Sequence, residues 1–85
     1  MNLTFSKKAD KCYQRLSLTI QKKADKQFIY LLNDLHYPSL NTKRKQGENI
    51  WEARIDYHYR FTFIIEGASI FILSIGMHDE GLGKK

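Results

Sequence analysis

The segment Ile50–Glu80, IWEARIDYHYRFTFIIEGASIFILSIGMHDE, decides the fold of this chain of 85 residues. Alternating polarity followed by a nearly continuous apolar run predicts three strands in it: Ile50–Ile55, Tyr59–Ile65 and Ile70–Ile75. The polar segments between them, Asp56–His58 and Glu66-Gly67, are typical of tight turns. Strands joined by such short turns are antiparallel neighbours, so the segment predicts one small sheet.

The chain before this segment predicts two amphipathic helices. Apolar residues recur along one face of Lys7–Leu16, and Ser6 is placed to cap its start. For the second helix, Ser17 or Thr19 is the expected cap, and Pro38 prevents its continuation. The apolar face of this second helix is predicted to consist of Ile20, Ala24, Phe28, Leu31, Leu32 and Leu35.

The remaining segments complete the predicted order of elements. Leu3–Phe5 alternates in polarity and predicts a short N-terminal strand, whereas the polar, basic segment Pro38–Asn49 predicts a loop. The order is therefore strand, helix, helix, strand, strand, strand. Because each helix has a single apolar face, the two cover one face of the sheet. The predicted class is α+β, with an N-terminal strand and a two-helix hairpin packed on one face of an antiparallel sheet.

Composition narrows the class of protein. Hydrophobic residues make up 42% of the chain, which predicts a single globular domain over residues 1–85. The net charge of +5 favours anionic partners such as nucleic acid, although it also serves solubility. Cys12 is the sole cysteine, which excludes an intramolecular disulfide and a cysteine-based metal site. The sequence has no signal peptide or membrane-spanning run, so we expect a cytoplasmic protein without a membrane partner.

Two arginines, Arg54 and Arg60, interrupt the apolar strands. Their positions in the alternation predict that both face away from the helices, on the same open face as Glu52. A surface salt bridge between Arg60 and Glu52 is the alternative interpretation. Six further polar residues, three from the loop and three after the last strand, are expected to converge on this face: Lys43, Arg44, Lys45, His78, Asp79 and Glu80.

Such a surface suits cleavage of RNA by attack of its own 2′-hydroxyl. A base takes the 2′ proton, cations stabilise the phosphorane and an acid protonates the departing 5′ oxygen, so no metal or cofactor is needed. Arginine binds two phosphate oxygens at once, and histidine titrates near neutral pH. A metal site formed by His78, Asp79 and Glu80 is a weaker alternative, because consecutive residues seldom converge on one ion.

These elements and motifs resemble the RelE/ParE superfamily of bacterial type II toxins. The motifs are a Trp-Glu-Ala-Arg strand, a Tyr-Arg-Phe strand, a Glu-Gly turn and an apolar strand that ends in Gly-x-His-Asp. The resemblance covers most of the chain and is strongest over Lys43–Glu80. The helices agree only in their pattern.

The resemblance implies one of three functions. RelE-like members are ribosome-dependent endonucleases that cut mRNA, whereas ParE-like members inhibit DNA gyrase and cut no RNA. A third possibility is a non-toxic relative that only binds an antitoxin. Under the first function, the implied partners are a cognate antitoxin, the ribosome and mRNA, and no cofactor is implied.

The resemblance also implies roles for individual residues. Arg60 matches the strand arginine that acts on the scissile phosphate, and Arg54 matches a frequently basic position. His78 matches a histidine that transfers a proton in YoeB-like members, and Asp79 or Glu80 is a candidate base. The basic residues implied to bind RNA are Lys43, Arg44 and Lys45.

The sequence departs from the YoeB-like pattern at two positions. Asn41 stands, by spacing, where that branch has a catalytic glutamate, and Asp79 follows His78 where the branch has a tyrosine. The general base is therefore left open between Asp79 and Glu80.

Overall fold

The structure of the protein is a computed structural model that describes residues 2–45 and 49–77. Its elements are, in chain order, β1 (Asn2–Phe5), α1 (Lys7–Arg15), α2 (Leu18–Asn33), the 3-10 helix η1 (Pro38–Leu40), β2 (Lys43–Arg44), β3 (Trp51–Arg54), β4 (Tyr59–Glu66) and β5 (Ser69–Met77). The predicted α+β class is confirmed. The segment Pro38–Asn49, predicted as a loop with the irregular start of a strand as an alternative, contains η1 and the two-residue β2.

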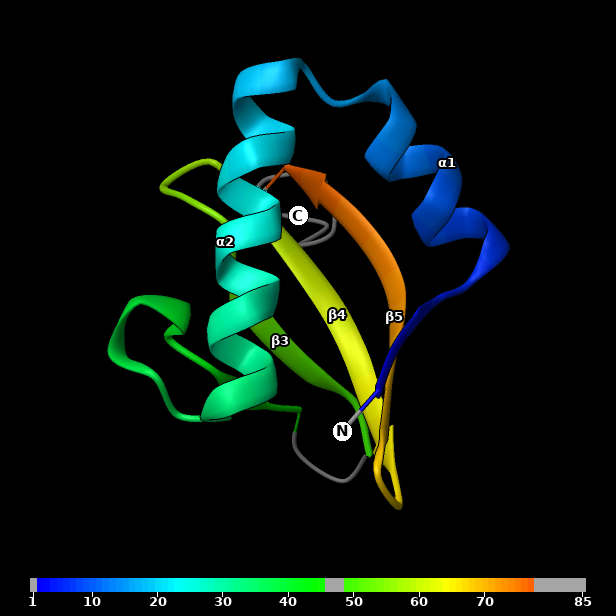
Figure 1. The fold of residues 1–85 in the computed structure, drawn as a ribbon, viewed down its shortest axis with the longest axis vertical. Coiled ribbons are helices and arrows are strands. Elements are labelled where there is room, and N and C mark those ends of the chain that lie inside the picture. The colour runs from blue at the N-terminus through cyan, green and yellow to red at the C-terminus, as the bar shows by residue number, and fades with distance from the viewer. Residues whose placement is uncertain (1, 46–48, 78–85) are drawn as a thin grey trace.

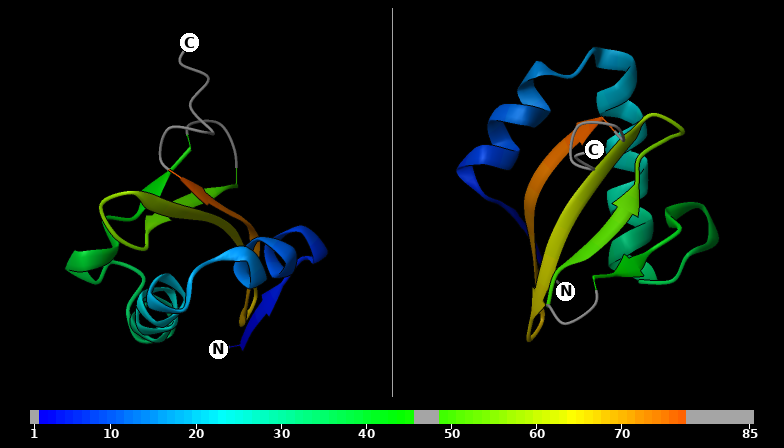
Figure 2. Two further views of the ribbon diagram at one scale, coloured as in Figure 1. Left: turned by 90° about the horizontal axis from the view of Figure 1, so that it is seen from above. Right: turned by 180° about the vertical axis from the view of Figure 1, so that it is seen from behind.

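The five strands form one sheet in the order β1-β5-β4-β3-β2. Strands β2 to β5 pair antiparallel, as predicted, but β1 pairs with β5 in parallel, with Leu3 opposite Ile70. The sheet is therefore mixed, because no short turn fixes the direction of β1 relative to its neighbour. Figures 1 and 2 show both helices on one face of the curved sheet, as the apolar patterns predicted.

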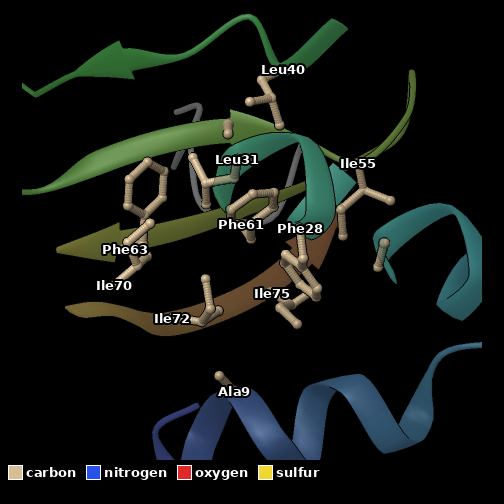
Figure 3. Close-up of a cluster of buried hydrophobic side chains, with 12 residues drawn as sticks. Ala9, Phe28, Leu31, Leu40, Ile55, Phe61, Phe63, Ile70, Ile72 and Ile75 are labelled. Carbon is tan, nitrogen blue, oxygen red and sulfur yellow. The ribbon is translucent and has the colours of Figure 1, made fainter. Parts of the chain in front are cut away.

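The core lies between the helices and the inner face of the sheet (Figure 3). Phe28 and Leu31 of α2 are buried there with Phe61 and Phe63 of β4 and Ile72 of β5. The rings of Phe28 and Phe61 meet edge to face, with centroids 5.0 Å apart. Fully burying side chains of this size contributes about 1.5–3 kcal/mol each, so this layer holds the sheet rigidly under its open face.

Ser6 joins the first helix to the last strand. Its Oγ accepts a hydrogen bond from the backbone N–H of Ala9 at 3.0 Å, which caps α1 as predicted. The same hydroxyl donates to the carbonyl of Leu73 at 2.9 Å. The register of β4 against β5 shifts at Leu73, because Thr62 lies opposite Ser74 but Phe63 lies opposite Ile72. Ser6 therefore satisfies a carbonyl at a β-bulge, where the strand ladder is disrupted.

The two helices also hold one another at their junction. The hydroxyl of Tyr13 on α1 donates to Oδ1 of Asp25 on α2 at 2.7 Å, and Nε2 of Gln21 donates to the carbonyl of Tyr13 at 2.9 Å. The hydrogen bond to Asp25, together with partial burial and the charge of that carboxylate, raises the pKa of Tyr13. Ser17 caps α2, which decides between the two predicted caps.

The buried face of α2 differs from its prediction at two positions. Leu32, expected to be buried, is 37% exposed, whereas Gln27 is 6% exposed. Gln27 is tolerated because its Nε2 donates to the carbonyls of Ser39 and Arg54, at 3.0 and 2.7 Å, and its Oε1 accepts from Ser39 Oγ. This one side chain fastens η1 and the end of β3 to α2.

The turn between β3 and β4 is closed by Asp56. Its Oδ1 accepts hydrogen bonds from the backbone N–H groups of His58 and Tyr59, at 2.8 and 2.9 Å. Its Oδ2 lies 3.4 Å from Nζ of Lys23 on α2. Burial opposes ionisation of Asp56, but the two backbone hydrogen bonds and Lys23 together lower its pKa below the ordinary value of 3.8.

The turn between β4 and β5 depends on Gly67. Its φ is +57°, in the region that favours glycine, and Glu66 pairs with Ser69 across the turn. Glycine at the first central position is the pattern of a type II′ hairpin, so the predicted Glu-Gly turn is confirmed. Separately, among residues 2–45 and 49–77 none of the helices is long and apolar enough to span a membrane.

Replacing Ser6 should cost more stability than replacing the equivalent cap of α2. Ser6→Ala removes both a helix cap and the partner of the Leu73 carbonyl, so we expect the free energy of unfolding to fall by about 2 kcal/mol. Ser17→Ala, the matched control, removes a cap alone and should cost about 1 kcal/mol. Urea denaturation of the two variants measures the difference, and equal losses would show that the contact with Leu73 adds nothing.

The charge of Asp56 should make stability depend on pH. Because the pKa of Asp56 is lowered in the folded state, its contribution is present above pH 3.8 and is lost as pH falls through the folded pKa. We therefore expect Asp56→Asn to lower the free energy of unfolding at pH 7, by about 1–2 kcal/mol. The difference between variant and parent should narrow below pH 3.8. Denaturation at a series of pH values tests this, and a gap that is constant with pH would contradict it.

Candidate functional site

Arg54 and Arg60 lie directly opposite one another on neighbouring strands. The adjacent pair, Ala53 and Phe61, is buried beneath the helices, at 0% and 1% exposure. Since successive side chains of a strand point to opposite faces, the two arginines share the open face, as the sequence predicted. Both are half-buried. We call them the arginine pair.

The arginine pair concentrates positive charge in an environment partly closed to water. Like charges directly opposite on a sheet repel one another, and a bound anion lowers this repulsion. Arg54 adds a second cost, because its Nε is buried and no hydrogen-bond partner for it is found among residues 2–45 and 49–77. A bound phosphate group supplies the acceptor oxygens that guanidinium groups prefer.

The residues next to the arginine pair on the open face are polar. Thr62 lies opposite both Glu52 on β3 and Ser74 on β5, and its hydroxyl is 2.7 Å from that of Ser74. Glu52 also lies opposite Lys43 on β2. Glu52, which the sequence offered as the alternative partner of Arg60, thus lies directly opposite Thr62 and Lys43. The residue directly opposite Arg60 on β3 is Arg54.

The three basic residues before β3 do not share one face, which corrects the prediction that they converge. Arg44 lies opposite Trp51, and its Cζ is 5.8 Å from the centroid of the indole ring. Trp51 stacks on the buried Phe63, so Arg44 lies on the side of the sheet that the helices cover. Lys43 lies opposite Glu52, on the open face. The difference arises because these residues form part of a strand, where side chains alternate, and not a loop.

Lys45 marks the point where β2 and β3 separate. Its backbone N–H donates to the carbonyl of Ile50 at 2.8 Å, and its side chain is exposed. Asn41, which stands at the position of the family glutamate, has a left-handed backbone with φ of +49° and ends η1.

The predicted residues His78, Asp79 and Glu80 lie outside the described part of the chain. Within the described part, the last pairs of β5 are Gly76 with Arg60 and Met77 with Tyr59. Among the described His, Cys, Asp and Glu residues, no group of three is arranged to hold a metal ion.

A second basic region lies on the helix side, at the end of β3. A cavity of about 360 Å³ is lined there by Lys23, Lys26, Tyr30 and Tyr37, among other residues. Lys23 is paired with Asp56, and Nζ of Lys26 is 5.9 Å from the centroid of Tyr30, which stacks on Tyr37. Arg54, whose carbonyl binds Gln27, also lines this cavity, and the ammonium groups of Lys23 and Lys26 there contact an acid and an aromatic ring.

Sequence reasoning missed two residues near the arginine pair. Nε2 of Gln27 donates a hydrogen bond to the carbonyl of Arg54. The signal for it was its spacing from Ala24 and Leu31, which puts it within the apolar face of α2. Tyr57 lies in the turn after β3 and is 80% exposed. An aromatic residue within the expected turn Asp56–His58 was the signal for it, since turns seldom bury aromatic rings.

Solved structures share this fold. A YoeB/ParE toxin from Agrobacterium tumefaciens matches with a TM-score of 0.80 and 16% identity, over 92% of this chain and 99% of that one. The YoeB–YefM complex from Staphylococcus aureus matches at 0.77 and 19% identity, over 92% and 97%. An archaeal RelE–RelB complex from Pyrococcus horikoshii matches at 0.79 and 15% identity, over 93% and 96%. No protein-family model and no curated protein sequence matches the chain.

The matches extend over nearly the whole of each solved chain, so they compare complete folds and not a shared fragment. The order of strand, two helices and three further strands that the sequence predicted is found in this chain. The chain therefore has the fold of the RelE and YoeB toxins.

Proposed function

We propose that this protein is a type II toxin that cleaves mRNA on the ribosome by attack of the RNA's own 2′-hydroxyl. The arginine pair on the open face is the observation that carries the proposal. The fold, shared with solved RelE and YoeB toxins, supports the same conclusion. The proposed unit is a single toxin domain over residues 1–85, acting in the cytoplasm.

In this proposal Arg54 and Arg60 bind the scissile phosphate. Negative charge on the phosphate rises as the 2′ oxygen attacks, and the paired guanidinium groups stabilise it where water is partly excluded. The strands that carry them are held by the core, since the neighbouring Ala53 and Phe61 are buried on the opposite face. The donors are therefore preorganised, and little reorganisation is needed as the transition state forms.

Proton transfer is assigned to residues that follow β5. His78 protonates the departing 5′ oxygen, and Asp79 or Glu80 takes the 2′ proton. Histidine suits the acid role because its unperturbed pKa of about 6.5 lies near the working pH. The reaction needs no metal or cofactor, because the nucleophile belongs to the RNA itself.

The basic residues before β3 are proposed to hold RNA from two sides of the sheet. Lys43 extends the cationic open face, whereas Arg44 and Lys45 contact RNA beyond the β2 edge, since Arg44 packs over Trp51. Phosphate contacts of this kind dominate affinity for RNA, and the net charge of +5 suits a ribosomal surface.

A cognate antitoxin is the proposed protein partner. The solved relatives include a YoeB–YefM complex and a RelE–RelB complex, in which a toxin of this fold is bound to a second protein. The charge of this chain predicts an acidic partner.

Replacing Arg60 should abolish cleavage without unfolding the protein. We expect Arg60→Ala to lower the rate of mRNA cleavage on programmed ribosomes by at least about a hundredfold, because a donor to the developing charge is lost. Arg15→Ala is the matched control, since Arg15 is exposed in the last turn of α1 and should leave the rate unchanged. Cleavage by Arg60→Ala at the parent rate would remove the arginine pair from the mechanism.

Expression of the parent protein distinguishes the implied functions. Arrest of translation with mRNA cut within codons supports the nuclease. DNA damage with intact mRNA identifies gyrase as the target, and unaffected growth with tight antitoxin binding identifies a non-toxic relative.

His78→Gln should slow cleavage by at least about tenfold, because glutamine cannot transfer a proton to the leaving oxygen. Single-turnover rates on programmed ribosomes measure this effect. A substrate with a 5′ sulfur leaving group, which needs no protonation, should restore the rate of the variant. An unchanged rate with the ordinary substrate would assign the acid role to another residue.

A further inference from the structure

Tyr57 is the most exposed of the large hydrophobic side chains in the described part of the chain, at 80%. It lies at the tip of the turn between β3 and β4, which projects from the sheet in Figure 1. An aromatic ring of this size gains nothing from burial in the isolated protein. A single exposed ring is common on protein surfaces, but this one lies on the connection between Arg54 and Arg60, where it is accessible to any ligand of the arginine pair.

The turn that carries Tyr57 is firmly held. Asp56 accepts hydrogen bonds from the backbone of His58 and Tyr59, and the N–H of Ile55 donates to the carbonyl of Tyr59 at 2.9 Å. The ring of His58 meets that of Tyr57 edge to face, with centroids 5.2 Å apart. A ring presented on such a turn loses little conformational freedom on binding, which favours affinity.

The position of Tyr57 relates it directly to the arginine pair. It comes three residues after Arg54 and three before Arg60, on the connection between the two strands. Three residues of chain span at most roughly 10 Å between Cα atoms, so the ring lies within reach of a nucleotide next to a phosphate held by the pair. A polymer with aromatic bases regularly spaced along a phosphate backbone matches both the exposed ring of Tyr57 and the arginine pair.

We propose that Tyr57 stacks on a nucleobase of the single-stranded RNA whose phosphate the arginine pair binds. This inference rests on the proposed function and adds to it a base-contacting residue. Every base offers a flat face, so stacking on tyrosine holds the strand with little demand on sequence, and purines bind somewhat better because they stack more strongly. Asp56 is the positioning residue for the ring, through the turn that it closes.

The test uses ribosomes programmed with a 2′-O-methylated mRNA, which lacks the nucleophile and therefore remains uncut. 2-Aminopurine, whose fluorescence is quenched by stacking, is placed in turn at each base of the codon in the A site. Binding of the parent protein should quench one of these positions. Tyr57→Phe keeps the ring and should behave as the parent does, whereas Tyr57→Leu should lose the quenching and bind about five- to a hundredfold more weakly.

An abasic nucleotide at the quenched position provides the matched control. If the ring and that base contact one another, removing the base should weaken binding by the parent but not by Tyr57→Leu. The large exposure of Tyr57 means that neither substitution should affect folding, which circular dichroism verifies.

The outcomes separate this inference from the function on which it rests. If Tyr57→Leu binds and quenches as the parent does while Arg60→Ala binds weakly, stacking is overturned and the arginine pair stands. If the parent does not bind programmed ribosomes, or if Arg60→Ala both binds and cleaves as the parent does, both proposals fall. Weak binding of an antitoxin by Tyr57→Leu, with unchanged binding to ribosomes, would reassign the ring to a protein contact.

Discussion

The register between β3 and β4 is the constraint on which the rest of the structure depends. In this register Ala53 and Phe61 meet in the core, and Arg54 and Arg60 meet on the opposite face. A slip of one residue would exchange the faces and place guanidinium groups against the helices. Asp56 fixes the register locally by accepting two backbone N–H groups in the turn. The geometry of the candidate site thus follows from one carboxylate and the side chains that alternate on either side of it.

The sequence was sufficient to predict the parts of the fold that depend on local pattern. The alternation in Tyr59–Ile65, the Glu-Gly turn and the serine caps each carry their structure within a few residues. The shared face of Arg54 and Arg60 was predictable for the same reason. Their pairing follows from the number of residues between them on two strands joined by a short turn. It depends on no helix and on no distant segment of the chain.

The features that sequence reasoning missed depend on contacts between distant residues. The parallel direction of β1 is set by pairing with β5, and the shift beside Leu73 involves Ser6, 67 positions earlier. Ile70–Ile75 is almost uniformly apolar, so no alternation could reveal where the strand changes register. Arg44 was misplaced because a two-residue strand is too short to show a period. Residues His78 and Asp79 were predicted from their place after the last strand and from the resemblance, and they remain predictions.

The apolar layer and the open face of the sheet have different roles in this fold. The helices and the inner face of the sheet supply apolar burial, and a single polar side chain, Gln27, fastens the end of β3 by its last carbonyl. The open face can therefore carry charged side chains without interrupting this apolar layer. Groups that bind anions are commonly unfavourable to the protein that displays them, and here a well-packed layer offsets their cost.

The parallel contact between β1 and β5 also governs when the sheet can be completed during synthesis of the chain. Asn2 lies opposite Ser69, so β1 finds its partner only after about 67 further residues have been made, which takes roughly 3–13 seconds at 5–20 residues per second. Until then the nascent chain lacks the parallel edge of its sheet, although Arg54 and Arg60 can already lie opposite one another on the hairpin of β3 and β4. The two faces of the molecule are therefore completed at different moments, with the pair of arginines in place before the first strand is joined to the sheet.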